Sequence, residues 1–151
     1  MKEVKITTNS ADETRALGET FGAHLKPGDL VTLRGDLGAG KTTFTQGVAR
    51  ALGAAEAATS PTYVLIIEHE GRVPFLHLDA YRLEDQCYDA IRDAGIFDFL
   101  DRDDAVKLVE WPQRIADFLP TPRFAIEIRA GAIDDSGVTD ERHITIIETE
   151  Q

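Results

Sequence analysis

The sequence predicts a single-domain α/β fold over residues 1–151, in which a central, mostly parallel sheet is flanked by helices and extended by antiparallel hairpins. Short runs of apolar and β-branched residues alternate along the chain with segments of helical periodicity. One of these runs leads into a glycine-rich loop and then a helix. The length of 151 residues, 42% of them hydrophobic, suits one domain with a real core, and no linker or repeat interrupts it.

Three elements are expected before the glycine-rich loop. Residues 4–7 (VKIT) predict a short strand. Ser10 followed by Glu13 is a capping-box pattern, which opens a helix extending to about Lys26. After a Pro-Gly-Asp turn, residues 30–33 (LVTL) form an apolar run with branched side chains, which predicts a strand.

A helix and a hairpin are expected after that loop. Apolar side chains recur at helical spacing in residues 42–52, and Gly53 suits the end of this helix. Residues 54–61 are small and irregular, which predicts a loop. The apolar runs 64–70 and 73–78 flank a Gly-Arg pair and predict a β-hairpin.

The second half of the chain repeats the alternation with shorter elements. A glycine interrupts its first helical stretch, a proline follows its second, and a polar loop separates its last two strands. The predicted elements are a helical stretch broken at Gly95 (83–100), a strand (105–109), a short helix (113–118) and a final strand pair (124–128 and 143–147).

Residues 35–42 (GDLGAGKT) fit the phosphate-loop pattern G-x-x-x-x-G-K-[ST] at every defined position. Backbone N–H groups in such a loop surround phosphate oxygens, and the dipole of the following helix adds positive potential. Lys41 is expected to reach the β- and γ-phosphates and Thr42 to offer its hydroxyl to Mg²⁺. The alternative is an ordinary turn between strand and helix, but the complete motif and its flanks favour a P-loop NTPase fold. The expected nucleotide-binding residues here are Asp36, Leu37, Gly38, Ala39, Gly40, Lys41, Thr42 and Thr43.

Two carboxylates, Asp79 and Glu110, follow predicted strands directly. If these strands and the phosphate-loop strand are parallel neighbours, both carboxylates converge on a metal ion beside the phosphates. The alternatives are a helix-capping Asp79 and a solvated Glu110, and the spacing leaves open which acid would bind Mg²⁺ directly. Ala80 occupies the position where a catalytic glutamate often follows the first acid, so hydrolysis is expected to be slow.

Other polar residues have less defined roles. The segment 59–63 (TSPTY) could form a switch loop in which Thr62 senses the γ-phosphate or positions water, or a simple proline turn. His77 shares a strand face with Asp79, which favours a core or supporting role. No N-K-x-D segment is present, so ATP is preferred over GTP, with Asp12 and Arg142 as candidates for the adenine pocket.

Charge and composition restrict the classes of function. The net charge of −11, from 27 acidic and 16 basic residues without a basic run, disfavours strong direct binding to nucleic acid. It favours a protein partner or a ligand neutralised by Mg²⁺. No apolar run could span a membrane, the first residues lack a signal peptide's apolar core, and the single cysteine, Cys87, cannot form an internal disulfide. A cytoplasmic protein is therefore expected.

The motif set resembles the bacterial TsaE family over residues 8–147. The resemblance is carried by GDLGAGKTT at 35–43, SPTY at 60–63, HLDAYR at 77–82 and Glu-Trp at 110–111, in this order and at this overall length. Many families share the phosphate loop alone, whereas the other three motifs are more specific.

The resemblance implies a small cytoplasmic ATPase required for the threonylcarbamoyladenosine modification at position 37 of transfer RNAs. It implies the partner proteins TsaD and TsaB, and ATP hydrolysis that is weak alone and stimulated by those partners. By motif match, Lys41 and Thr42 take the phosphate and Mg²⁺ roles, Glu110 becomes a Mg²⁺ ligand, and Trp111 lies near the nucleotide.

Two other functions stay open at this point. A small-molecule kinase would need a second substrate pocket, and often a lid with clustered arginines, whereas the arginines here are scattered. A non-catalytic nucleotide sensor would use ATP only to set its affinity for a partner.

Overall fold

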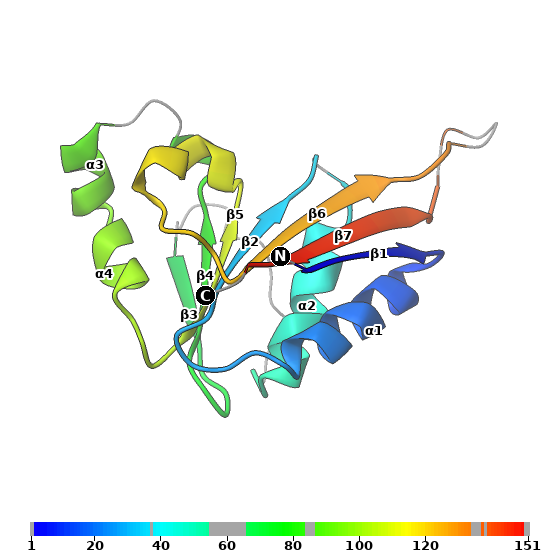
Figure 1. Ribbon diagram of the computed structural model, residues 1–151, viewed down its shortest axis with the longest axis horizontal. Coiled ribbons are helices and arrows are strands. Elements are labelled where there is room, and N and C mark those ends of the chain that lie inside the picture. The colour runs from blue at the N-terminus through cyan, green and yellow to red at the C-terminus, as the bar shows by residue number, and fades with distance from the viewer. Residues whose placement is uncertain are drawn as a thin grey trace.

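The structure is a computed structural model that describes residues 2–36, 38–54, 66–83, 87–133, 137 and 139–149. Within these residues the chain alternates between strands and short helices, as Figure 1 shows. The strands are β1 (Lys2–Thr8), β2 (Leu30–Arg34), β3 (Ile66–His69), β4 (Phe75–Asp79), β5 (Val106–Glu110), β6 (Phe124–Ala130) and β7 (Arg142–Glu148). The helices are α1 (Ala11–Gly22), α2 (Lys41–Ala51), α3 (Tyr88–Asp93) and α4 (Ile96–Leu100), with the 3-10 helices η1 (Tyr81–Leu83) and η2 (Pro112–Phe118).

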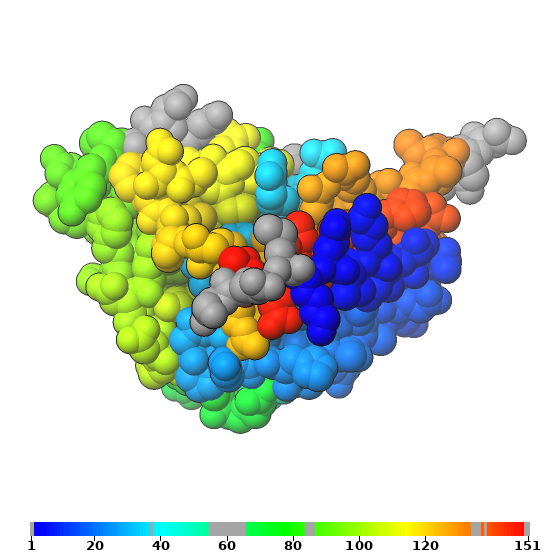
Figure 2. Space-filling view, viewed as in Figure 1, coloured from blue at the N-terminus to red at the C-terminus, as the bar shows by residue number. Residues whose placement is uncertain are grey.

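All the described strands form one sheet in the order β1-β7-β6-β2-β5-β4-β3. The four central strands, β6, β2, β5 and β4, are mutually parallel, whereas β1, β7 and β3 pair antiparallel to their neighbours. This confirms the predicted α/β architecture with a parallel centre and antiparallel hairpins. In the space-filling view from the same side, the dark-blue atoms of β1 lie beside the red atoms of β7 (Figure 2).

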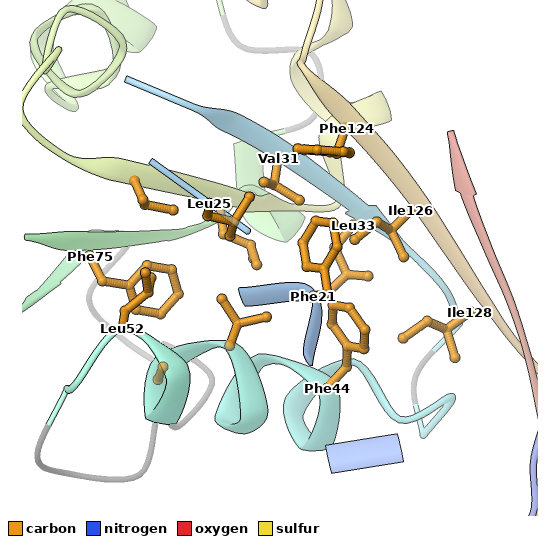
Figure 3. Close-up of a cluster of buried hydrophobic side chains, with 14 of the residues drawn as sticks. Phe21, Leu25, Val31, Leu33, Phe44, Leu52, Phe75, Phe124, Ile126 and Ile128 are labelled. Carbon is orange, nitrogen blue, oxygen red and sulfur yellow. The ribbon is translucent and has the colours of Figure 1, made fainter. Parts of the chain in front are cut away.

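Two hydrophobic layers enclose the sheet. Helices α1 and α2 cover one face, where Phe21 contacts the rings of Phe44 and Phe124 with centroids 5.7 Å and 5.0 Å away (Figure 3). On β4 and β5, Leu76 and Val109 point to the opposite layer, which α3, α4 and η2 complete. Among the described helices, none has the length and apolar character needed to cross a membrane.

Most predicted elements are present, with differences in their ends. The helix α1 begins after Ser10, whose Oγ accepts from the Glu13 N–H at 3.0 Å, as the capping pattern predicts. It ends at Gly22, four residues before the predicted Lys26, and the next N–H groups, of His24 and Leu25, bond to carbonyl oxygens three residues back instead of four. The stretch 83–100 contains α3 and α4, with η1 ending at its first residue, and the predicted break at Gly95 is confirmed by its φ of 84°. The 113–118 segment is a 3-10 helix.

Two glycines allow α1 and α2 to pack closely. A Cβ atom at Gly47 would lie 2.0 Å from the carbonyl oxygen of Arg15, and one at Gly18 would lie 2.2 Å from that of Phe44. No side chain fits at these distances, so the two backbones are in direct contact. This contact fixes α2, and with it the loop at its N-terminus, against the rest of the domain.

We predict that Gly47→Ala lowers the free energy of unfolding by about 3 kcal/mol, because the added methyl group must push the helices apart. The thermal midpoint should fall by roughly 6–12 °C. Thr20→Ala, at an exposed position of α1, is the matched control and should leave the midpoint nearly unchanged. A Gly47→Ala variant as stable as the wild type would contradict the close contact.

Candidate functional site

The phosphate loop connects β2 to α2 at the carboxyl end of the parallel strands. Gly40 caps α2 with a φ of 103°, in the left-handed region that favours glycine. Since Gly40 has no side chain, no side chain at the N-cap position hydrogen-bonds to the first turn of α2. Gly35 is required for a different reason, because a Cβ there would lie 2.7 Å from the carbonyl oxygen of Ile128. The loop therefore has the backbone geometry of an anion site.

Lys41, the first residue of α2, is buried with only 6% of its surface exposed. Its Nζ donates to the carbonyl oxygen of Gly35 at 2.6 Å and lies 4.0 Å from the centroid of the Trp111 ring. Burial lowers the pKa of Lys41 from its ordinary value, and the negative charges of Glu110, Asp79 and Asp36 oppose this shift. A poorly hydrated cation surrounded by carboxylates is suited to bind a polyanion that brings its own counter-ion.

The two strand-end carboxylates are brought together by strand register. In the parallel pair of β4 and β5, Asp79 lies opposite Glu110, and Glu110 lies opposite Leu33 at the end of β2. The strand adjacency on which the sequence argument depended is therefore confirmed. The roles of Asp79 and Glu110 toward a metal ion stay predictions.

Asp79 is half-buried, and its carboxylate makes a capping contact in addition to its predicted role toward a metal ion. Its Oδ1 accepts from the backbone N–H of Tyr81 at 2.9 Å, which is the capping contact considered as the alternative to a metal role. Burial raises the pKa of Asp79; the Tyr81 hydrogen bond opposes this shift, and the charge of Glu110 adds to it. The second oxygen of the carboxylate is not needed for the cap, so capping and metal binding are compatible.

Glu110 is 2% exposed and lies against the ring of His77, which is fully buried. The His77 Nε2 is 2.6 Å from the Glu110 Oε2. The supporting role expected for His77 is consistent with this contact. The sequence could place His77 and Asp79 on one strand face, but it could not show that the histidine reaches across to the neighbouring strand.

Trp111 follows Glu110 in a strained conformation. With φ 56° and ψ 48°, it is the non-glycine residue with positive φ among those that the structure describes. For a bulky side chain this region costs roughly 1–2 kcal/mol. The strained backbone places the indole over Lys41 and 4.9 Å from the Tyr81 ring, with the Arg114 guanidinium 5.4 Å from the Trp111 centroid. Tyr81 and Arg114 were not singled out from the sequence as parts of this site.

A small cavity of about 50 Å³ lies on one side of the loop. Arg142 fixes one wall through hydrogen bonds from its guanidinium to the carbonyl oxygens of Thr139 at 2.7 Å and Gly38 at 3.3 Å. The sequence singled out Gly40, Thr43 and Arg142 but gave no signal for the other members. The lining residues are Ala11, Thr14, Gly40, Thr43, Asp140 and Arg142.

A second cavity, of about 250 Å³, lies on the other side of the loop. It is lined at the end of β2 by Arg34 and Asp36, at the start of η2 by Trp111 and Gln113, and by β6. In Figure 2 the end of β2, in light blue, is visible between η2 in yellow and β6 in orange. Arg34 and Gln113 carried no motif, and their only sequence signal is adjacency to the loop and to Trp111.

The remaining predicted residues lie away from the loop, at the start of α2, or outside the described residues. The Asp12 side chain is 96% exposed and pairs with Arg15 at 2.9 Å, whereas its neighbours Ala11 and Thr14 line the small cavity. Thr42 lies in the first turn of α2 and is partly buried. Leu37 and Thr62, with the rest of 59–63, lie outside the described residues.

Comparisons with known proteins show which family the chain is similar to. A family model described as threonylcarbamoyl adenosine biosynthesis protein TsaE matches residues 8–143. The chain is similar to the tRNA threonylcarbamoyladenosine biosynthesis protein TsaE of Bacillus subtilis (strain 168), with 41% identity over 140 residues that cover 92% of this chain and 85% of the relative. The protein of the same description from Treponema pallidum (strain Nichols) is 34% identical over 143 residues, covering 90% and 98% of the two chains.

A solved structure shows the same fold. The crystal structure of YdiB from Bacillus subtilis superposes with a TM-score of 0.72 and 36% sequence identity, covering 97% of this chain and 86% of that one. The likeness extends over the sheet and the helices, because nearly the whole chain is matched.

Asp79 provides a test of the electrostatics of the site. Because its folded-state pKa is raised, the folded protein retains a proton at pH values where the unfolded chain has lost it, so this group's contribution to stability falls as the pH rises. We expect Asp79→Asn to raise the thermal midpoint at pH 7, and the gain to shrink toward pH 4. Asp117→Asn, at an exposed carboxylate, is the control. A lower midpoint for Asp79→Asn at pH 7 would show that the folded state stabilises this charge.

Proposed function

This chain belongs to the TsaE family of threonylcarbamoyladenosine biosynthesis proteins, and we propose that within this pathway it binds and hydrolyses ATP with Mg²⁺. One observation carries the proposal. The ammonium of Lys41 lies at the base of a phosphate loop, in the field of two carboxylates that parallel strands bring to the same sheet edge. A phosphate chain with a divalent cation matches these charges, because the phosphates would lie against the ammonium and the cation against the carboxylates.

The position of the loop determines which way round the nucleotide would bind. The phosphates would bind the backbone N–H groups at the N-terminus of α2, with the γ-phosphate at Lys41. The adenine would then lie toward the cavity formed by Ala11, Thr14 and Arg142. Arg142 supports this direction, because it is held against the loop by its contact with the Gly38 carbonyl.

The residues present fit a Mg²⁺ ion that is shared with ATP. Among the described residues, no group of three or more histidine, cysteine or acidic side chains could hold an ion alone. Thr42, Asp79 and Glu110 offer only hard oxygen ligands, and Mg²⁺ commonly takes few ligands from protein and the others from phosphate and water. The ion would neutralise charge that develops between the β- and γ-phosphates. Asp79 and Glu110 would hold it directly or through water.

Nucleotide binding requires Lys41 to change partners. Its Nζ would release the Gly35 carbonyl and turn to the phosphate oxygens, while the Trp111 ring, 4.0 Å away, shields it from water. Ala80, which takes the place of a possible catalytic base, is fully buried and donates its N–H to the Glu110 carbonyl oxygen at 3.0 Å. Hydrolysis by the protein alone should therefore be slow.

We further propose that TsaD and TsaB are the partners that stimulate this ATPase, and that the modification is made at position 37 of the transfer RNA. The family membership and the missing base at Ala80 support this part of the proposal. Ala80 also favours the second candidate function, a nucleotide sensor in which ATP sets affinity for the partners without turnover.

The first test measures ATP hydrolysis by the protein alone and with a TsaD–TsaB complex. We expect slow turnover alone, clear stimulation by the partners, and loss of both in Lys41→Ala. ATP binding by this variant should weaken about 10–100-fold, because a charged hydrogen-bonding partner of the phosphates is removed.

The alternatives give different results in the same assay. Tight ATP binding without stimulation, together with modification activity sustained by a non-hydrolysable analogue, would indicate the sensor. Fast phosphate transfer to a metabolite would indicate a kinase. Full ATP binding by Lys41→Ala would refute the site itself.

A second test addresses the metal. We expect Glu110→Gln to bind ATP in the presence of EDTA about as well as the wild type, but to lose most of the affinity that Mg²⁺ adds, because the amide removes a negative ligand oxygen. Calorimetric titration with ATP at several Mg²⁺ concentrations measures both quantities. Glu70→Gln, at an exposed carboxylate beside β3, is the control. Equal Mg²⁺ dependence in Glu110→Gln and the wild type would refute the metal role.

A further inference from the structure

His77 makes a contact in the site to which the proposed function assigns no task. The ring is fully buried on β4, two residues before Asp79, and its Nε2 lies 2.6 Å from the Oε2 of Glu110. Glu110 is itself 2% exposed, so its carboxylate depends on partners within the protein rather than on bulk water. This contact joins β4 to β5 at the sheet edge where the metal ligands are expected.

The surroundings of the ring determine which atom donates. A carboxylate oxygen only accepts hydrogen bonds, so the His77 Nε2 must carry the proton in this contact. The Nδ1 atom is buried and has no hydrogen-bond partner among the described residues. A buried N–H group without a partner is rarer than an unpaired acceptor, so we assign the tautomer with its single proton on Nε2.

The orientation of the ring is fixed by stacking. The Phe75 ring lies nearly parallel to that of His77, with an interplanar angle of 10° and centroids 6.2 Å apart. The ring of His69, on β3, stacks in turn on the Phe75 ring, with centroids 5.7 Å apart. Because the imidazole cannot turn freely, its N–H direction is set before any ligand binds.

We propose that His77 is a positioning residue that holds Glu110 ready for the metal ion. The hydrogen bond engages Oε2, leaves Oε1 as the oxygen available to the ion or its water, and restricts the rotamers of a flexible side chain in advance. The proposal rests on the proposed function, because it requires Glu110 to act toward Mg²⁺. A merely structural role would stabilise the fold without changing how ATP binding depends on Mg²⁺.

The test measures two quantities for each variant. The first is the affinity for ATP in EDTA, and the second is the Mg²⁺ concentration at which half of the Mg²⁺-dependent gain in ATP affinity is reached. In His77→Leu we expect ATP affinity in EDTA within about twofold of the wild type, and a Mg²⁺ requirement raised about tenfold or more, the effect typical of losing a hydrogen bond to a metal ligand. His77→Gln places an amide N–H near the position of Nε2 and should restore the requirement to within about threefold. His77→Asn is too short to reach and should behave like His77→Leu.

His69→Leu is the matched control, because it removes a ring from the same stack without touching Glu110. It should leave the Mg²⁺ requirement unchanged. Circular dichroism and thermal midpoints verify that each variant is folded; if His77→Leu is not, the comparison of His77→Gln with His77→Asn decides.

Three results would overturn the inference. Unchanged Mg²⁺ dependence in the folded His77 variants would show that Glu110 needs no positioning. Equal losses of ATP affinity with and without Mg²⁺ would indicate a structural role only. The same Mg²⁺ requirement in His77→Gln and His77→Asn would indicate this too. If the wild type itself gained no ATP affinity from Mg²⁺, the proposed function would fail first, and the wild-type titration alone would reveal it.

Discussion

The parallel register of β2, β5 and β4 is the constraint on which the site depends. Leu33 pairs with Glu110, and Glu110 with Asp79, so one row across three strands fixes the loop entrance and both carboxylates. Parallel strands end at the same sheet edge, and a slip by one residue would turn each side chain to the other face. The two hydrophobic layers hold this register by burying alternate residues of the same strands on opposite faces.

Unfavourable features are concentrated at this edge. Lys41 is a buried cation whose pKa is lowered, Asp79 is an acid whose pKa is raised by burial, and Trp111 adopts a left-handed conformation. Each of these costs stability in the protein without ligand, and each would be relieved or used when a polyanion with its cation binds. The well-packed interface of α1 and α2 offsets these costs at a distance from the site.

The carboxyl-terminal strands, which carry little motif, contribute much of the wall around the loop. The Ile128 carbonyl oxygen on β6 lies 2.7 Å from the position that a Cβ of Gly35 would take, and Arg142 on β7 hydrogen-bonds to the Gly38 carbonyl. These two contacts act on the start and the middle of the phosphate loop, and the two cavities lie beside them. The final hairpin therefore shapes the approach to the phosphates from both sides.

The sequence by itself determined the α/β class, the phosphate loop, the acids at the strand ends and the family. Each of these is local: glycine spacing, an apolar run and the residue that follows it are read within a few positions. It also predicted the break at Gly95 and the Ser10 cap for the same reason.

Tertiary structure alone decided the strand order, and therefore which strand-end acids meet. It decided that His77 reaches Glu110, that Trp111 covers Lys41, and that Arg142 rather than Asp12 lies at the loop. These contacts join residues that are distant in the chain, and they depend on twist, register and side-chain direction, which periodicity does not encode. Asp12 illustrates the limit, because its position on α1 lies close to the cavity but its side chain points to solvent beside Arg15.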